Sequence, residues 1–385
     1  MIFYGRQDIN EADIQAVEQV LRSDFLTQGP MIERFEKCVA EYCGAKHAVA
    51  VTNATSALHI ACLAAGLGSG DTLWTSPITF VASANCGRYC GANVDFVDID
   101  AKTYNMSIVA LEEKLQQAKE SDSVPKIVVP VHLAGQSCDM KRIHELSEEY
   151  GFTVLEDASH AVGADYLGDK VGSCKFSDMA VFSFHPVKII TTGEGGMVLT
   201  NNDELYEKLR LYRSHGITRN LECMTHESDG PWYYQQIELG FNYRMTDIQA
   251  ALGYSQMKRL NKFVARRRKL ASQYNRLLED LPCITPHVAS EARSSWHIYI
   301  VRIDFTRVKR DKKKIFKEMR ERGVALNLHY IPVHMQPYYR GLGFQNGDFP
   351  VSEKYYSEAF TLPLYYELTD EQQGEVVTLL KDVLL

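Results

Sequence analysis

Short apolar runs with strand character alternate with helical patterns along the first part of the chain. Strand patterns occupy residues 48–51, 72–75, 94–97, 127–129, 152–155 and 179–184, with helical periodicity at 55–65 and 140–150 among them. This alternation is typical of strand–helix–strand units, whose helices cover a parallel sheet. It predicts an α/β layer fold with a mostly parallel central sheet.

Two amphipathic helices precede this alternation, and a different pattern follows it. Asn10 is placed to cap the first helix, and the chain break at residues 29–30 precedes the second. Beyond about residue 246 we expect a long helix over 247–281, strands at 298–301 and 324–328, and a helix at 312–322. We therefore expect a large domain over 1–250 and a smaller C-terminal α+β domain over 251–385.

Charge and hydropathy argue against two kinds of partner. The net charge is −7, whereas proteins that bind nucleic acids usually carry a basic excess. The one dense basic run, at residues 266–269, is expected to form a solvated helix face. No apolar run approaches the ~20 residues that span a bilayer, and the N-terminus lacks the pattern of a signal peptide. We expect neither a nucleic-acid partner nor a membrane.

The nine cysteines occur without CxxC spacing, so neither a zinc site nor any other metal is expected. Cys38 and Cys43, like Cys86 and Cys90, fall four or five residues apart in helical segments. Most of the cysteines are expected to be reduced core thiols, which fits a cytoplasmic protein.

Ligands of open α/β sheets bind at the carboxyl ends of the strands, and polar or aromatic residues follow several of them here. Asn53, Thr55 and Ser56 open a helix after the first strand. Amides at a helix N-terminus suit a phosphate, although the same residues also serve as plain helix caps. Phe80, after the next strand, is placed either to stack on a planar cofactor or to pack in the core.

Two further strand ends carry ionisable groups. Asp157 follows an apolar run, where a carboxylate needs a partner, and it is suited either to hold a protonated ring nitrogen or to cap a turn. Lys188 lies between a buried strand and the glycine-rich residues 193–196. A buried lysine becomes a nucleophilic amine. The glycines do not match the dinucleotide fingerprint, which disfavours a nicotinamide enzyme.

Together these residues supply what pyridoxal 5'-phosphate (PLP) requires. They offer an amine for covalent attachment, a carboxylate for the pyridine nitrogen, hydroxyls and amides for the phosphate, and a ring that stacks. A protein tunes PLP through its lysine and through the partner of the pyridine nitrogen. The sequence therefore predicts a PLP enzyme.

The chain resembles the DegT/DnrJ/EryC1/StrS family of sugar-nucleotide aminotransferases, which are PLP enzymes of fold type I. The resemblance rests on residues 54–58, 76–85, 159–161, 183–188 and 191–196, and matching segments run from 26–30 to 329–332. It implies that Lys188 holds PLP through a Schiff base, that Asp157 is the pyridinium partner and that Phe80 stacks on the cofactor. Phosphate contacts are implied for Thr55, Ser56 and Ser183.

Other positions carry weaker or shared roles in this resemblance. His160 stands where many relatives have glutamine, so its role beside the cofactor stays open. Asn242 is implied to complete the phosphate site of a second subunit, which makes the expected unit a homodimer with shared active sites; from the residues alone it is a polar loop residue. Substrate contacts are implied for Tyr4, Thr27, His329 and Tyr330. His334 and Tyr338 are further candidates, although the residues of this turn also fit a packed aromatic turn.

The resemblance also implies a reaction. Some relatives carry histidine at the position of Lys188 and perform dehydration, so the lysine favours amino transfer. The implied substrates are L-glutamate and a nucleotide sugar, and the matching branch aminates C4 of a UDP-linked 4-keto-6-deoxy (2-acetamido) sugar, as in pseudaminic acid synthesis. The alternatives are amination of GDP-4-keto-6-deoxymannose to perosamine, another PLP reaction such as dehydration or lysis of an amino acid, and a non-catalytic PLP-binding regulator.

Overall fold

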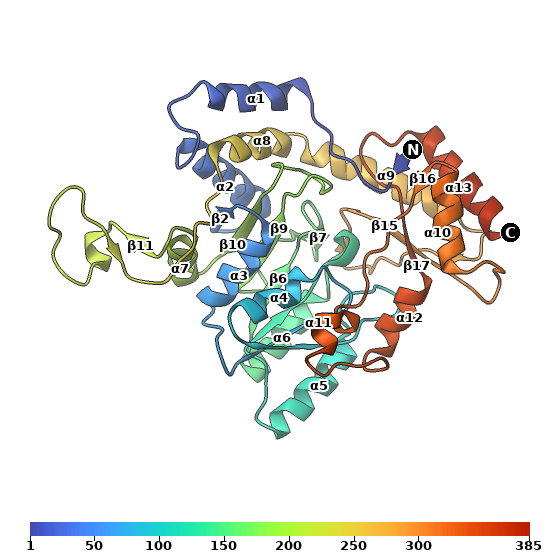
Figure 1. Cartoon of the computed structure of the whole chain (residues 1–385), viewed down its shortest axis with the longest axis horizontal. Coiled ribbons are helices and arrows are strands. Elements are labelled where there is room, and N and C mark those ends of the chain that lie inside the picture. The colour runs from blue at the N-terminus through green and yellow to red at the C-terminus, as the bar shows by residue number, and fades with distance from the viewer.

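The computed structural model describes residues 1–385, which fold around a seven-stranded sheet (Figure 1). The strand order is β2 (His47–Val51), β10 (Gly196–Thr200), β9 (Met179–Ser183), β6 (Thr153–Asp157), β5 (Ile127–Val129), β3 (Thr72–Thr75) and β4 (Asn93–Phe96). β10 runs antiparallel to both of its neighbours, β2 and β9, and all other neighbouring pairs are parallel. The predicted α/β fold with a mostly parallel central sheet is confirmed.

Helices cover both faces of the sheet because its strands are buried on both sides. One face packs against α3 (Ala54–Ala64), α4 (Ala82–Tyr89) and α7 (Asp203–Arg213). The other face packs against α2 (Pro30–Cys43), α5 (Ile108–Glu120), α6 (Met140–Tyr150), α8 (Asp247–Met257) and α9 (Leu260–Leu277). The result is a three-layer arrangement in which a cavity remains at the carboxyl ends of the strands.

The local sequence determines where α3 begins, at the carboxyl ends of the strands. Asn53 caps α3 by accepting the Ser56 amide hydrogen at 2.8 Å. The strand next to β2 in the sheet, β10, begins with Gly196, where a Cβ atom would lie 2.6 Å from the Ala54 nitrogen. Glycine is therefore required for β10 to pass against the N-terminus of α3. The predicted cap of α1 (Glu11–Leu21) by Asn10 is also present.

The C-terminal part has its own sheet and core. β13 (Cys283–Ile284), β15 (Tyr299–Ile303) and β17 (Ala359–Leu362) pack with α9, α10 (Lys312–Glu321) and α13 (Asp370–Leu384). β1 (Ile2–Phe3) pairs in parallel with β16 (Val324–Ala325), so the first residues of the chain lie against this part. Both termini accordingly lie on the same side of the molecule in Figure 1. None of the helices is both long and apolar enough to cross a membrane.

An arm extends from the body beside α7 (Figure 1). β11 (Ile217–Thr218) and β12 (Gln235–Gln236) form its base. The arm and the residues just after β12 expose five large apolar side chains, those of Leu221, Trp232, Tyr234, Ile237 and Leu239. Contiguous exposed apolar side chains commonly mark a surface that another molecule covers.

Two sequence-based expectations about the C-terminal helices are wrong. The helix expected over 247–281 is two helices, because α8 ends at Met257 and α9 begins at Leu260. The basic run at 266–269 is not a solvated face, because Arg267 is only 2% exposed. Its Nη1 atom donates hydrogen bonds to the carbonyl oxygens of His297, Leu364 and Trp296.

Removal of the Arg267 guanidinium is expected to destabilise the protein. Arg267→Met leaves its carbonyl partners without their donor, and each buried unsatisfied acceptor costs about 1–3 kcal/mol. We expect the free energy of unfolding to fall by at least about 3 kcal/mol, measured as a lower urea midpoint. The matched control is Lys269→Met, which removes an exposed ion pair with Asp370 and is expected to cost less than about 1 kcal/mol. Equal midpoints for the two variants would contradict this assignment.

Candidate active site

Residues from several strand ends meet around a cavity of about 840 Å³ at the carboxyl edge of the sheet. The loops after β2, β3, β6 and β9 all contribute to its walls, as does the segment 327–330 from the C-terminal part. Ten of the predicted site residues line it: Tyr4, Thr55, Ser56, Phe80, Asp157, His160, Ser183, Lys188, His329 and Tyr330. The structure thus brings together residues that are up to 326 positions apart in the chain, from Tyr4 to Tyr330.

Four other candidate residues do not line this cavity. Thr27 and Asn242 are exposed and lie in short bridges with Thr246 and Ser214, respectively. His334 is fully buried, with its Nε2 atom 3.1 Å from Glu353, and Tyr338 is an exposed residue of α11 (Pro337–Arg340). His334 is therefore packed as the alternative held, whereas Tyr338 is exposed, and neither lines the cavity of this chain.

Lys188 follows β9 in a tight turn, in which its amide donates to the carbonyl oxygen of His185 at 2.9 Å. Burial lowers the pKa of its amine to about 8, although the nearby Asp157 carboxylate opposes this shift. A lysine with a pKa near 8 is neutral, and hence nucleophilic, in an appreciable fraction of molecules at neutral pH. The cavity therefore holds an amine prepared for attack on a carbonyl compound.

The pH dependence of covalent capture follows from that pKa. Only the neutral amine attacks, so the rate at which PLP-free protein captures PLP is expected to rise about tenfold for each pH unit below 8. Above about pH 8 the rate is expected to level off. The measurement is the absorbance change at the cofactor band after mixing PLP with the PLP-free protein in buffers of different pH. A rate that keeps rising to pH 10 would instead indicate a lysine of ordinary basicity.

Asp157 is the last residue of β6, and each oxygen of its carboxylate accepts one hydrogen bond from the protein. The Ser83 hydroxyl donates to Oδ2 at 2.5 Å, and the Ser159 amide donates to Oδ1 at 3.1 Å. Thr79 supports Ser83 at 2.6 Å between their hydroxyl oxygens. A carboxylate accepts about four hydrogen bonds, so this buried group keeps acceptor capacity toward the cavity that it lines. This arrangement fits the protonated ring nitrogen of PLP.

The N-terminus of α3 forms another wall of the cavity. Asn53 already occupies the Ser56 amide, whereas the Ala54 and Thr55 amides belong to the turn whose N–H groups have no partner within the helix. The hydroxyls of Thr55 and Ser56, and that of Ser183 from the end of β9, line the same space. Amides, hydroxyls and the positive end of a helix dipole suit a phosphate dianion. These residues therefore fit the PLP phosphate.

His160 and Tyr330, which both line the cavity, are joined by a hydrogen bond. Burial strongly lowers the pKa of His160, so its imidazole is neutral. Its Nδ1 atom accepts the Ala134 amide hydrogen at 3.3 Å, which places the ring hydrogen on Nε2. Nε2–H then donates to the Tyr330 hydroxyl oxygen at 3.0 Å. The hydroxyl hydrogen of Tyr330 is consequently available to a ligand in the cavity.

Two residues that the sequence analysis did not single out belong to this site. Ser83 holds Asp157, as described above. His297 lines the cavity with its ring centroid 4.4 Å from that of His160, and its buried Nδ1 atom has no hydrogen-bond partner within the chain. Its position two residues before the start of β15, in an apolar context, is the only signal that could have marked it in the sequence.

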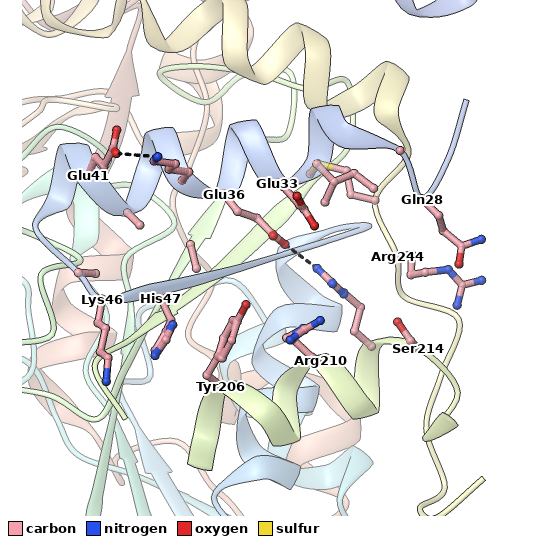
Figure 2. Close-up of a pocket in the computed structure, with 18 residues that line it drawn as sticks. Gln28, Glu33, Glu36, Glu41, Lys46, His47, Tyr206, Arg210, Ser214 and Arg244 are labelled. Carbon is pink, nitrogen blue, oxygen red and sulfur yellow. Dashed lines mark hydrogen bonds and ion pairs between the residues drawn. The ribbon is translucent and has the colours of Figure 1, made fainter. Parts of the chain in front are cut away.

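A second cavity, of about 640 Å³, lies beside the edge strand β2 between α2 and α7 (Figure 2). Glu36 and Arg213 meet across it at 2.6 Å. Glu36 also accepts the Ala50 amide hydrogen, and Arg213 donates to the Ala50 carbonyl oxygen at 3.0 Å. The ion pair therefore occupies the backbone amide and carbonyl of Ala50 on the free edge of β2. Edge strands whose backbone groups are occupied in this way avoid pairing with other chains.

Comparisons with known proteins agree with this geometry. A model of the DegT/DnrJ/EryC1/StrS aminotransferase family matches residues 7–381. The UDP-4-amino-4,6-dideoxy-N-acetyl-beta-L-altrosamine transaminase of Campylobacter jejuni is 36% identical, over 96% of this chain and 93% of that protein. The GDP-perosamine synthase of Caulobacter vibrioides is 37% identical, over 99% and 97%.

Solved structures give the same picture. Helicobacter pylori PseC, an aminotransferase involved in the biosynthesis of pseudoaminic acid, superposes with a TM-score of 0.90 at 32% identity. The superposition covers 100% of this chain and 99% of that one. Other similar solved chains include a PLP form.

Proposed function

The chain belongs to the DegT/DnrJ/EryC1/StrS aminotransferase family and is a PLP-dependent sugar aminotransferase, and on this premise we propose its specific reaction. In this proposal it moves the amino group of L-glutamate to C4 of a UDP-linked 4-keto-6-deoxy-2-acetamido sugar. One observation carries it: Lys188, with its lowered pKa, and Asp157 face one cavity that also contains the N-terminus of α3. The UDP sugar and the C4 position are supported by the name of the Campylobacter relative, and the pseudaminic acid branch by that of PseC.

Each residue of the cavity has a defined task in this proposal. Lys188 anchors the cofactor covalently, and when it is released its Nζ atom accepts and returns the proton of the substrate carbon. Asp157 keeps the ring nitrogen protonated, with Ser83 fixing the carboxylate. PLP, when bound, supplies an electron sink for the negative charge that develops at that carbon.

The remaining wall residues bind and orient. Thr55, Ser56 and Ser183 hold the phosphate. Phe80 stacks on the cofactor ring; its side chain is 58% exposed in the chain, which excludes the alternative that it packs in the core. His329, Tyr330 and Tyr4 bind the sugar nucleotide, and the free hydroxyl hydrogen of Tyr330 is one donor for it.

We also propose that the protein acts as a homodimer with shared active sites. Thr27 and Asn242 are exposed and lie outside the cavity of their own chain. The arm at 217–236 carries large apolar side chains that a second copy would cover. In the dimer, Thr27 and Asn242 of one subunit complete the substrate and phosphate sites of its partner.

Mixing two inactive variants tests this sharing. Lys188→Ala lacks the amine, and Asn242→Ala lacks the phosphate contact from the neighbouring subunit. A hybrid dimer has one site with both residues intact and one with neither, so unfolding and refolding the two variants together is expected to restore turnover. If Asn242 acts within its own chain, no site in the hybrid is complete and turnover stays as low as in the variants alone.

The substrate assignment is tested by offering UDP-linked and GDP-linked 4-keto-6-deoxy sugars in parallel, with L-glutamate as donor. Amination of only the UDP-linked 2-acetamido sugar is the expected result, and the configuration of its new C4 amine then identifies the branch. Turnover with only the GDP sugar would support perosamine synthesis, which the Caulobacter relative performs by its name.

A further inference from the structure

Three aromatic residues with polar ring atoms or hydroxyls lie around His160 in the wall of the active-site cavity. They are Tyr330, His329 and His297. The ring centroids of His297 and His329 lie 4.4 and 6.5 Å from that of His160, and Tyr330 is hydrogen-bonded to His160. His329 and Tyr330 have tasks in the proposed reaction, whereas His297 has none so far.

The main chain of His297 is fixed by two hydrogen bonds. Its amide donates to the Ala134 carbonyl oxygen at 2.9 Å, and its carbonyl oxygen accepts from the buried Arg267 guanidinium at 2.9 Å. The Ala134 amide in turn donates to Nδ1 of His160. The imidazole of His297 is 3% exposed and lines the cavity, so it presents a group of fixed position to any ligand there.

The surroundings of the His297 ring determine which nitrogen carries the hydrogen. Burial holds the pKa of His297 well below its usual value, so the ring is neutral and has one N–H group. Nδ1 is enclosed and has no hydrogen-bond partner. In protein interiors an N–H group without an acceptor is rarer than an acceptor without a donor. The hydrogen therefore lies on Nε2, which also has no partner in the chain but is not enclosed.

The same reasoning gives the hydrogen position in His329. The Thr361 hydroxyl is fully buried, and its hydrogen-bond partner is Nδ1 of His329 at 2.8 Å. The hydroxyl donates to Nδ1, because its hydrogen has no other acceptor in the chain. Burial lowers the pKa of His329 to about 3, so this ring is neutral as well and carries its hydrogen on Nε2. With the hydroxyl hydrogen of Tyr330, the cavity wall has three donors on uncharged groups.

Three uncharged donors suit a ligand group that only accepts hydrogen bonds. A carboxylate accepts about four and donates none, whereas a sugar hydroxyl also needs an acceptor for its own hydrogen. Arginine is the common partner of carboxylates in proteins, but no arginine of the chain lines this cavity. Of the two proposed substrates, L-glutamate is the one that carries carboxylates. The wall around His160 therefore fits the amino donor.

We propose that the Nε2–H group of His297 donates a hydrogen bond to a carboxylate of the amino donor, beside the donors of His329 and Tyr330. This assignment rests on the proposed use of L-glutamate as the donor. The sugar nucleotide occupies the same cavity after glutamate has left. Neutral imidazoles leave no unpaired buried charge facing the sugar, which an arginine in their place would do. His297 thus determines the affinity for the donor without determining that for the sugar.

Substitution of His297 tests the proposal in the reaction with L-glutamate alone. Loss of the PLP absorbance after glutamate is added gives the maximal rate and the half-saturating glutamate concentration. His297→Phe keeps an aromatic ring and removes the donor, so we expect the half-saturating concentration to rise at least about tenfold, as for loss of one hydrogen bond to a charged group. The maximal rate is expected to change much less. His297→Gln, whose amide can donate from a similar position, should recover part of the affinity.

The matched control is His144→Phe, which replaces a histidine of α6 outside the cavity and is expected to behave as the unaltered protein. No group of the chain is hydrogen-bonded to the His297 ring, so its replacement should not lower the urea midpoint. If His297→Phe proves less stable, His297→Met, which is smaller and also lacks an N–H group, takes its place.

A second measurement follows the sugar nucleotide with protein that glutamate has already aminated. The half-saturating sugar concentration is expected to be the same in His297→Phe and the unaltered protein. An equal rise for both substrates would overturn the proposal. A shifted PLP absorbance maximum with unchanged affinity for glutamate would also overturn it, because His297 would then contact the cofactor.

Failure of this proposal is distinguishable from failure of the proposed function. If the unaltered protein does not react with L-glutamate, the donor itself is wrong, and the role of His297 is refuted with it. If the unaltered protein reacts and His297→Phe has the same half-saturating glutamate concentration, only the role of His297 is refuted.

Discussion

Lys188→Ala is expected to give no measurable turnover. A general base alone contributes about 10²–10⁴-fold, and in this account Lys188 is also the covalent anchor of the cofactor. The measurement is 2-oxoglutarate release in the presence of L-glutamate, PLP and acceptor sugar. The matched control is Lys175→Ala, which removes an exposed lysine paired with Asp169 and is expected to leave turnover unchanged.

The same variant should keep its fold, which separates loss of chemistry from loss of structure. Burial disfavours the charged form of Lys188, as its lowered pKa records. Its folded pKa lies below the unfolded value of 10.5, so this amine lowers stability in full below about pH 8 and progressively less as the pH rises toward 10.5. Its removal should therefore not lower the urea midpoint near pH 7. Near-normal turnover of folded Lys188→Ala would end the assignment.

Asp157→Asn is expected to fold and to bind PLP but to lose most of its turnover. The amide is neutral and cannot hold a proton on the ring nitrogen, although Ser83 and Ser159 still contact it. Removal of one preorganised electrostatic partner costs about 10²–10³-fold in rate, so we expect a fall of at least about 10²-fold. Absorbance shows whether PLP is bound, and steady-state kinetics give the loss.

The control for this substitution is Asp169→Asn, which changes an exposed carboxylate. Its turnover should match that of the unaltered protein. An unchanged rate in Asp157→Asn would remove the role of this residue, even if Lys188 kept its own.

The sequence predicted the parts of the site that depend on strand ends. Asp157, Ser183 and the residues after β2 follow apolar runs directly, and parallel strands bring such positions to one edge. The same reasoning explains Glu156, which points to the opposite face and pairs with His132 at 2.6 Å between Oε2 and Nε2. This buried carboxylate within β6 has a partner, as the cost of burying a charge requires.

Contacts that depend on packing between distant segments could not be predicted in the same way. Arg267 appears in a basic run, and only the position of α9 against the loops that carry His297 and Leu364 shows that it is buried. His297 and Ser83 carry no local pattern that separates them from core residues. Thr27 and Asn242 lie outside the cavity of their own chain, so the roles implied for them depend on the proposed dimer.

The most direct test of the central claim follows the nitrogen atom itself. L-glutamate labelled with heavy nitrogen is given to the PLP-loaded protein together with the UDP-linked 4-keto-6-deoxy-2-acetamido sugar, and both products are analysed by mass spectrometry. The account predicts one labelled amino sugar for each 2-oxoglutarate released, and neither product with Lys188→Ala. Release of 2-oxoglutarate without a labelled sugar, or loss of water from the sugar without amination, would contradict it.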